Sequence, residues 1–279
     1  MIKLLVDSAS DYMKSELEGR NIEFIPLGVT IDGTTYSDGI ELTKDKFYEL
    51  LLNTKEFPKT SMPSPAAYMD IFQSAKEKGD DVICILLSSE LSGTYQSAVT
   101  AKSMVDYDRI YIVDSRLVAG CIKIMVEYAD RLRSQGLSAK EIYLRLESLK
   151  NRVKVYAAVD TLEYLYRGGR LSRAAAAVGT IANLKPIITL EDGKVSVVKK
   201  SLSRMKAKND LVDIITGLKI DPEFSPYTVF TCGTENLERF ETDLVEKGVP
   251  FSGRLQVGPT IGAHVGPEVF GLFLVKAES

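Results

Sequence analysis

The sequence predicts an α/β fold composed of two α/β domains with mostly parallel sheets. Short apolar runs typical of buried strands recur along the chain, and they alternate with segments whose apolar residues repeat at helical spacing. This alternation is typical of helices that cover a mostly parallel sheet. The strand pattern restarts after Asn151, so we place the domains at residues 1–151 and 152–279. A chain of 279 residues, 45% of them hydrophobic, is long enough for two cores.

Local patterns place the elements of the first domain in order. Strands or extended segments are expected at residues 2–6, 21–31, 82–87 and 110–113. Helices are expected at residues 11–20, 43–53, 65–78, 97–104, 122–132 and from 139 onward. Ser64 followed by Pro65 is a favourable helix start, and Ser138 with Glu141 forms a capping box. Asp32-Gly33 is typical of a hairpin turn.

The second domain shows the same kinds of pattern. Strands are expected at residues 153–159, 187–190, 195–198, 227–231, 251–257 and 269–275, with a hairpin turn at 191–194. Helices are expected at residues 160–166, 174–177 and 234–247. Residues 258–267 are rich in glycine and proline, and we expect them to form a loop.

The composition argues against several classes of protein. The net charge of −3 does not favour bulk binding to nucleic acid. Cys84, Cys121 and Cys232 lie apart without CxxC spacing, which indicates reduced thiols, and a single histidine excludes a His-rich metal site. No apolar run reaches the ~18 residues that span a membrane, and the first residues are typical of a strand and not of a signal peptide. We therefore expect a cytoplasmic protein.

Hydroxyl groups and a glycine gather where the apolar run of residues 82–87 meets the following helix. Ser92, Gly93 and Thr94 lie at this junction. The first turn of a helix offers unpaired backbone N–H groups that favour an anion, and glycine allows a close approach to the backbone. This pattern predicts an anion cradle made of neutral groups. Simple N-capping of the helix by Ser92 explains the pattern equally well.

Three further groups of residues are candidates for a functional role. Thr60 and Ser61 form a second hydroxyl loop before a helix, although an ordinary proline-rich turn also explains them. His264 lies among glycines and prolines, and we favour a functional role for a histidine in such a loop. Asp7 and Asp11 follow the first strand, where ligands bind in open α/β sheets, but capping explains them as well.

Two basic segments allow alternative interpretations. Arg167 and Arg170 flank a glycine pair that is also typical of a helix end. Five cations without an intervening acid occupy positions Lys199, Lys200, Arg204, Lys206 and Lys208. Such a run is usually a solvated face, and the alternative is a docking patch for an acidic partner or phosphate.

Five segments together resemble the DegV family of fatty-acid-binding proteins. They are residues 7–11, 60–64, 88–95, 162–170 and 261–267, with the sequences DSASD, TSMPS, SSELSGTY, LEYLYRGGR and IGAHVGP. They span the chain and follow the family's order, so they are specific in combination although each is weak alone. Met62 stands where the family often has glutamine, which leaves both neighbouring hydroxyls in place.

The resemblance implies a lipid-binding protein without a cofactor and without enzyme activity of its own. It implies that two α/β domains hold a long-chain fatty acid such as palmitate, with its head group near the inter-domain side. The resemblance implies that the carboxylate is bound by the hydroxyl of Thr60 or Ser61 and by the hydroxyl of Ser92. It implies that Gly93 and Thr94 lie alongside these groups. It also implies that His264 lies near the same head group.

The resemblance also implies a partner in the bacterial cytoplasm. Such proteins present the fatty acid to a separate, dihydroxyacetone-kinase-like fatty acid kinase that makes acyl-phosphate from ATP. Arg204 is the first candidate for contact with this kinase, and Arg170 is the second. The resemblance implies no nucleic-acid partner and no membrane span, but it allows transient contact with a membrane.

A fatty acid suits such a site on physical grounds. Burial of about fourteen methylenes at ~0.8 kcal/mol each gives roughly 11 kcal/mol of gross transfer free energy, from which ordering and association costs are subtracted. The carboxylate needs hydrogen bonds when it leaves water, and hydroxyls, helix amides and one imidazole can supply them. We therefore expect no lysine or arginine to be needed beside the head group.

Two other functions remain open from the residues alone. Ser92 and His264 could serve a hydrolase or acyltransferase as nucleophile and base, although Leu91-Ser92-Gly93 is no Gly-x-Ser-x-Gly elbow. A phosphate or nucleotide enzyme is the second alternative, but the sequence has no P-loop and no GxGxxG after its first strand.

Overall fold

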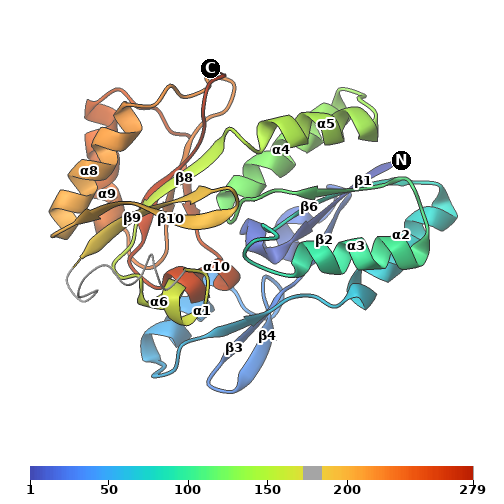
Figure 1. Cartoon of the computed structure of the whole chain (residues 1–279), viewed down its shortest axis with the longest axis horizontal. Coiled ribbons are helices and arrows are strands. Elements are labelled where there is room, and N and C mark those ends of the chain that lie inside the picture. Colours follow the sequence, from blue (N-terminus) through green and yellow to red (C-terminus); the bar gives the residue numbers. More distant parts are fainter. Residues whose placement is uncertain (172–183, 279) are drawn as a thin grey trace.

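The computed structural model describes residues 1–171 and 184–278 and confirms the α/β class (Figure 1). A parallel sheet of order β2-β1-β6-β7 lies in the first half of the chain, with β1 at Ile2–Asp7, β2 at Ile22–Ile25, β6 at Asp81–Leu86 and β7 at Ile110–Asp114. Its central strands β1 and β6 are almost continuously apolar because helices cover both faces. The expected helix at 174–177 lies outside the described residues.

Two helix pairs enclose the parallel sheet. Helices α2 (Pro65–Lys78) and α3 (Thr94–Val105) pack on one face, where Leu5 and Cys84 contact Tyr68 and Phe72. Helices α4 (Gly120–Ser134) and α5 (Ala139–Leu149) cover the other face, where they bury Val6 and Ile85. The capping box at Ser138 is present and begins α5 as predicted.

The second large sheet has six strands in the order β10-β9-β8-β13-β11-β12. The strands are β8 (Val153–Ala158), β9 (Lys185–Glu191), β10 (Lys194–Ser201), β11 (Tyr227–Phe230), β12 (Arg254–Gln256) and β13 (Phe270–Val275). The expectation of mostly parallel strands is wrong for this sheet, because only β11 and β12 pair in parallel. The tight β9–β10 hairpin forces an antiparallel pair, and β13 inserts antiparallel between β8 and β11.

The two faces of the six-stranded sheet have different neighbours. Helices α8 (Arg204–Thr216) and α9 (Glu235–Glu246) cover the outer face over Ala158, Ile187 and Leu272. The inner face is turned toward the parallel-sheet domain (Figure 1). Helix α8 was not predicted, because its basic residues obscured its apolar positions. The domain boundary near Asn151 stays a prediction, although the chain passes there from α5 to β8.

A third, small antiparallel sheet connects the two halves. Its order is β4-β3-β5, with β3 at Gly28–Ile31, β4 at Thr34–Ser37 and β5 at Lys59–Ser61. Helix α1 (Lys44–Asn53) packs against it, and so does helix α10 (Pro259–Val265) from the far end of the chain. The C-terminal segment that carries His264 is therefore packed among N-terminal residues.

Two local predictions are corrected by the structure. Residues 258–267 are not a loop, because Gly258 and Pro259 begin helix α10 and Gly266 ends it. The expected helix at 11–20 contains only a short 3₁₀ turn at Lys14–Leu17, and another 3₁₀ turn precedes it at Ser8–Ser10. The short helix expected after β8 is confirmed as α6 (Glu163–Arg167).

Candidate ligand-binding cavity

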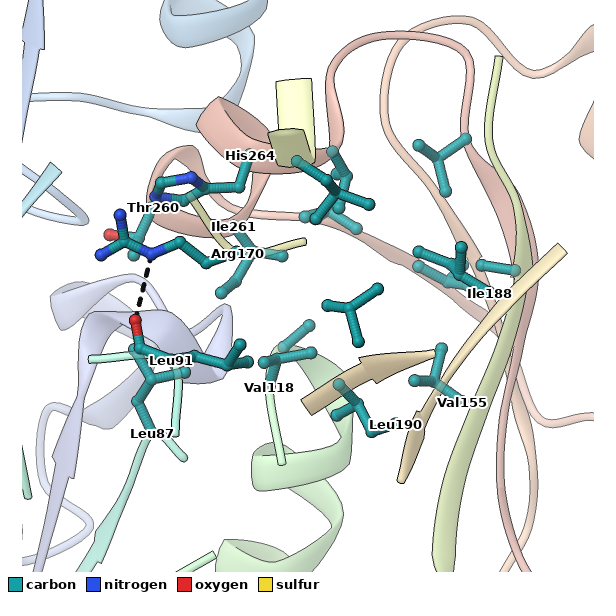
Figure 2. Close-up of a pocket in the computed structure, with 18 of the residues that line it drawn as sticks. Leu87, Leu91, Val118, Val155, Arg170, Ile188, Leu190, Thr260, Ile261 and His264 are labelled. Atoms are coloured by element: carbon teal, nitrogen blue, oxygen red, sulfur yellow. Dashed lines mark hydrogen bonds between the residues drawn. The ribbon is translucent and has the colours of Figure 1, made fainter. Parts of the chain in front are cut away.

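A cavity lies between the carboxyl ends of the parallel strands and the inner face of the six-stranded sheet (Figure 2). It contains about 830 Å³ of space free of protein atoms, part of it open to solvent. Both halves of the chain contribute to its walls, so folding of the whole chain creates the cavity.

Most of the cavity wall is aliphatic. Side chains of a strand alternate between its faces, and the positions Val155 and Ala157 on β8 therefore share the inner face with Ile188 and Leu190 on β9. The loop after β6 and the start of α4 close the opposite wall, where Figure 2 shows Leu91 and Val118. An apolar chain is the kind of group that this wall accommodates.

Polar side chains converge at one end of the cavity. The hydroxyl of Thr60 lies 2.8 Å from Nε2 of His264, and that of Ser92 lies 2.8 Å from the hydroxyl of Thr94. Arg170 donates from Nε to the carbonyl of Leu91 at 3.1 Å. Figure 2 shows Arg170 beside His264, across the cavity from Val155 and Ile188. The cavity therefore has one polar end and an apolar body.

The electrostatics at the polar end favour an anion. Burial, together with the nearby positive charge of Arg170, lowers the pKa of His264 to about 4, so the imidazole is neutral at pH 7. Nδ1 of His264 is buried without a hydrogen-bond partner. Arg170 is the one charged side chain at neutral pH among the described residues that line the cavity. A bound carboxylate would supply the counter-charge that Arg170 lacks there.

Glycine is required beside the histidine. A Cβ atom at Gly168 would lie 2.3 Å from Nδ1 of His264 and 3.0 Å from the carbonyl oxygen of Tyr164. The glycine pair that follows α6 thus lets the chain pass close to the imidazole and turn Arg170 toward Leu91. This gives the Arg-Gly-Gly-Arg segment a role at the cavity in addition to ending the helix.

The structure brings together some of the expected ligand residues and separates others. Thr60, Ser92 and His264 line the cavity. Ser61 does not, because it follows Thr60 on β5 and points to the opposite, exposed side. Thr94 is buried and holds the hydroxyl of Ser92 without lining the cavity.

Gly93 and Arg170 also depart from the sequence-based expectations. Gly93 is exposed, and a Cβ there would lie 2.3 Å from Sδ of Met62, so the glycine accommodates that side chain and does not line the cavity. Arg170, expected at a partner surface, lines the cavity instead. We expected no arginine beside the head group, but Arg170 lies at the polar end of the cavity.

The aliphatic wall and Thr260 were missed by sequence reasoning. An apolar residue that lines a cavity has the same sequence pattern as one in a filled core. Thr260 lies one helical turn before His264, but the expectation of a loop concealed this spacing.

The basic stretch is largely balanced by acids from elsewhere in the fold. Lys199 and Lys206 pair with Asp210, and Lys208 pairs with Asp243. The guanidinium of Arg204 pairs with Asp160 and Glu268. These ion pairs offset much of the positive charge of the stretch in the folded protein.

The geometry does not assemble a serine hydrolase triad. The hydroxyl of Ser92 bonds to Thr94, and no hydrogen bond between Ser92 and His264 occurs among the described residues. A general base needs an acid to orient its second ring nitrogen, but Nδ1 of His264 has no partner and Gly168 packs against it. These contacts favour binding over acyl transfer.

The described part of the chain lacks two further kinds of feature. In residues 1–171 and 184–278, no group of three or more His, Cys, Asp or Glu side chains is arranged to hold a metal. No helix in this part of the chain is long and apolar enough to cross a bilayer.

Comparison with known proteins links the chain to a family. The family model described as "Uncharacterised protein, DegV family" matches residues 1–277. A DegV domain-containing protein of Caldanaerobacter subterraneus subsp. tengcongensis is 38% identical over 274 residues, which cover 98% of each chain.

Solved structures agree with this match. A DegV family protein from Thermus thermophilus, reported with fatty acid binding, has a TM-score of 0.87 and 29% identity over 99% of both chains. A stearic acid-binding protein from Eubacterium ventriosum has a TM-score of 0.88 and 30% identity, covering 99% of this chain and 98% of that one. DegV of Bacillus subtilis, reported as a fatty acid binding protein, has a TM-score of 0.83 and 30% identity over 99% of both chains.

Proposed function

The chain belongs to the DegV family, and we propose that it binds one long-chain fatty acid in the cavity and presents it to a separate kinase. The observation that carries this proposal is an apolar cavity with polar groups gathered at one end. A fatty acid has the same asymmetry, with a long apolar chain and a single anionic group. Related proteins of similar fold are reported to bind fatty acids.

Each end of the cavity would contribute differently to binding. Burial of the tail against the aliphatic wall supplies most of the affinity, at about 0.8 kcal/mol for each methylene. The head group would receive hydrogen bonds from the hydroxyls of Thr60 and Ser92, and Arg170 would offset its charge. His264 stays neutral and can donate one ring N–H toward this end of the cavity. The polar end thus fixes the orientation of the ligand.

The polar end is close enough to the surface for presentation to a second protein. Met62 and Gly93 are exposed next to Thr60 and Ser92, which line the cavity. We propose that an ATP-dependent fatty acid kinase reaches the carboxylate from this side and forms acyl-phosphate. Arg204 stays our proposed kinase contact, because its guanidinium remains half exposed although it is paired with Asp160 and Glu268.

The binding proposal is tested by native mass spectrometry of the delipidated protein. We expect a one-to-one adduct after incubation with palmitate or oleate, and solvent extraction should recover the same fatty acid. Hexadecylamine, which carries a cation on an apolar chain of the same length as palmitate, is the matched control and should bind much more weakly. A bare protein mass after incubation with both fatty acids would contradict the proposal.

Presentation is tested separately with a DegV-partner kinase and ATP. We expect Arg204→Ala to reduce acyl-phosphate formation while fatty-acid affinity stays unchanged, because Arg204 does not line the cavity. Lys208→Ala removes a nearby cation and serves as control. Equal loss in both variants would indicate a general effect of charge and would reject Arg204 as a specific contact.

A further inference from the structure

Three aspartates are buried together near the carboxyl end of β1, outside the cavity. This aspartate cluster consists of Asp7, Asp11 and Asp38, and each side chain is at most 1% exposed. None of the three forms an ion pair within residues 1–171 and 184–278. Buried carboxylates without a paired cation are costly, so their contacts require an explanation.

Two members of the cluster hold the start of helix α10. Oδ2 of Asp38 accepts hydrogen bonds from the backbone N–H of Thr260 at 3.1 Å and from its hydroxyl at 2.5 Å. Oδ1 of Asp11 accepts from the backbone N–H of Gly258 at 2.7 Å. Both aspartates belong to the N-terminal part of the chain, whereas α10 lies near its C-terminal end.

Helix α10 connects these contacts to the cavity. Thr260 and His264 are four residues apart, so they lie one turn apart on the same face, and both line the cavity. The helix has only seven residues, and a displacement of its first turn is therefore transmitted to its last. The position of the imidazole beside Thr60 depends on where the first turn is held.

The cluster is unfavourable for stability at neutral pH. Burial raises the pKa of Asp7 to about 7 and those of Asp11 and Asp38 to about 6. The negative charge of Asp11 contributes to the raised pKa of Asp38, whereas Lys44 and Lys123 partly oppose the rise in the pKa of Asp11. Asparagine could occupy the same space at a lower electrostatic cost, so stability alone does not explain the carboxylates.

We propose that Asp38 and Asp11 are positioning residues, which fix the first turn of α10 and thereby set His264 against Thr60 at the polar end of the cavity. This inference rests on the proposed fatty-acid binding, because it assigns the two aspartates a role in shaping the head-group site. A carboxylate accepts from both the N–H and the hydroxyl of Thr260 through one oxygen. Asparagine keeps one such oxygen but is uncharged, and its second position, which the carboxyl of Asp38 uses toward Ser8, becomes an NH₂ group.

The single histidine of the chain makes a direct test possible. In protein labelled with ¹⁵N-histidine, every imidazole signal belongs to His264. We expect Asp38→Asn to shift these ring signals in the ligand-free protein and to weaken palmitate binding by up to about tenfold, the factor for one neutral hydrogen bond at the polar end that a displaced His264 would no longer support. Circular dichroism checks that the variant keeps its fold.

Asp210→Asn is the matched control. Asp210 is also 1% exposed, but its partners Ser201, Lys199 and Lys206 lie on β10 and α8, away from α10. This variant should lower the melting temperature and leave the His264 signals in place. Thr260→Val provides a second perturbation, because it removes the hydroxyl donor to Asp38 while the backbone N–H stays.

The outcomes separate this inference from the proposed function. Unchanged His264 signals in both Asp38→Asn and Thr260→Val would overturn the positioning role, even if palmitate binds. Shifted signals in a protein that binds no fatty acid would support the positioning of His264 while rejecting the proposed function. Shifted signals with unchanged palmitate affinity would overturn the assigned contribution to the head-group site.

Discussion

The two ends of the cavity differ in the kind of residues that line them and in how these residues are positioned. At the polar end, Thr60, Ser92, Arg170 and His264 come from four separate segments, and each makes a specific hydrogen bond or charge contact. The body of the cavity is made of aliphatic side chains on adjacent strands, which share one face of the six-stranded sheet. The difference indicates that orientation depends on a few residues, whereas affinity is distributed over many.

The largest expected effect comes from filling the apolar body. Ala157→Phe places a ring on the inner face of β8 and should exclude part of a long tail. We expect palmitate affinity to fall about a hundredfold, which corresponds to roughly three or four methylenes left outside at about 0.8 kcal/mol each. Isothermal titration calorimetry with palmitate and octanoate measures this effect. Octanoate is the control and should lose much less, and equal losses for both acids would contradict a tail site at Ala157.

Removal of the cation at the polar end should have the next largest effect. Arg170→Met should weaken palmitate binding about thirtyfold, within the range for charge-assisted hydrogen bonds, and should raise the pKa of His264 because a neighbouring positive charge is lost. Fluorescent fatty-acid displacement and imidazole NMR measure the two effects. Arg167→Met is the control, since Arg167 pairs with Glu163 outside the cavity. An unchanged affinity would remove Arg170 from the head-group site.

A smaller effect is expected from a single hydroxyl. Ser92→Ala should reduce palmitate affinity about fivefold, as for one neutral hydrogen bond, and leave the fold intact. Displacement titration measures the affinity, and thermal unfolding checks the fold. Ser89→Ala makes the same chemical change in the same loop, where the hydroxyl bonds to Asp114 outside the cavity. Identical affinities in the two variants would exclude Ser92 as a ligand residue.

A separate prediction concerns stability instead of affinity, and it is the pH dependence of unfolding. The pKa of His264 is about 4 in the fold, below the ordinary value of 6.5, so the unfolded chain binds a proton first as the pH falls. The stabilising effect of the neutral imidazole is present above pH 6.5 and is lost progressively toward pH 4. Urea unfolding at several pH values measures the unfolding free energies of the wild type and of His264→Gln. We expect the wild type to lose stability relative to His264→Gln as the pH falls from 6.5 to 4. A difference that is constant with pH would contradict the low pKa of His264.

The sequence reveals the polar end of the cavity better than its body. Hydroxyls at Thr60 and Ser92 and an isolated His264 stand out because such residues near glycines and helix starts are chemically distinctive. Ile188 and Val155 do not stand out, since burial in a core and exposure to a cavity require the same apolar side chains. The α/β class follows from alternating strand and helix patterns, but the pairing of β13 between β8 and β11 depends on contacts distant in sequence.

Local sequence reasoning also failed where long-range contacts decide the structure. Residues 259–265 form a helix although glycine and proline flank them, because Asp11, Asp38 and the packing of Phe47 hold the segment in place. Arg170 appeared to be a surface cation, and only the fold shows that the glycine turn directs it into the cavity.

A crystal structure with ω-bromopalmitic acid tests the proposed orientation of the ligand most directly. Bromine at the end of the tail gives an anomalous signal that locates one atom without ambiguity. We expect this signal between the six-stranded sheet and α4, near Val118 and Leu190, with the carboxylate between Ser92 and His264. A bromine signal beside Thr60 and His264, or on the protein surface, would contradict it.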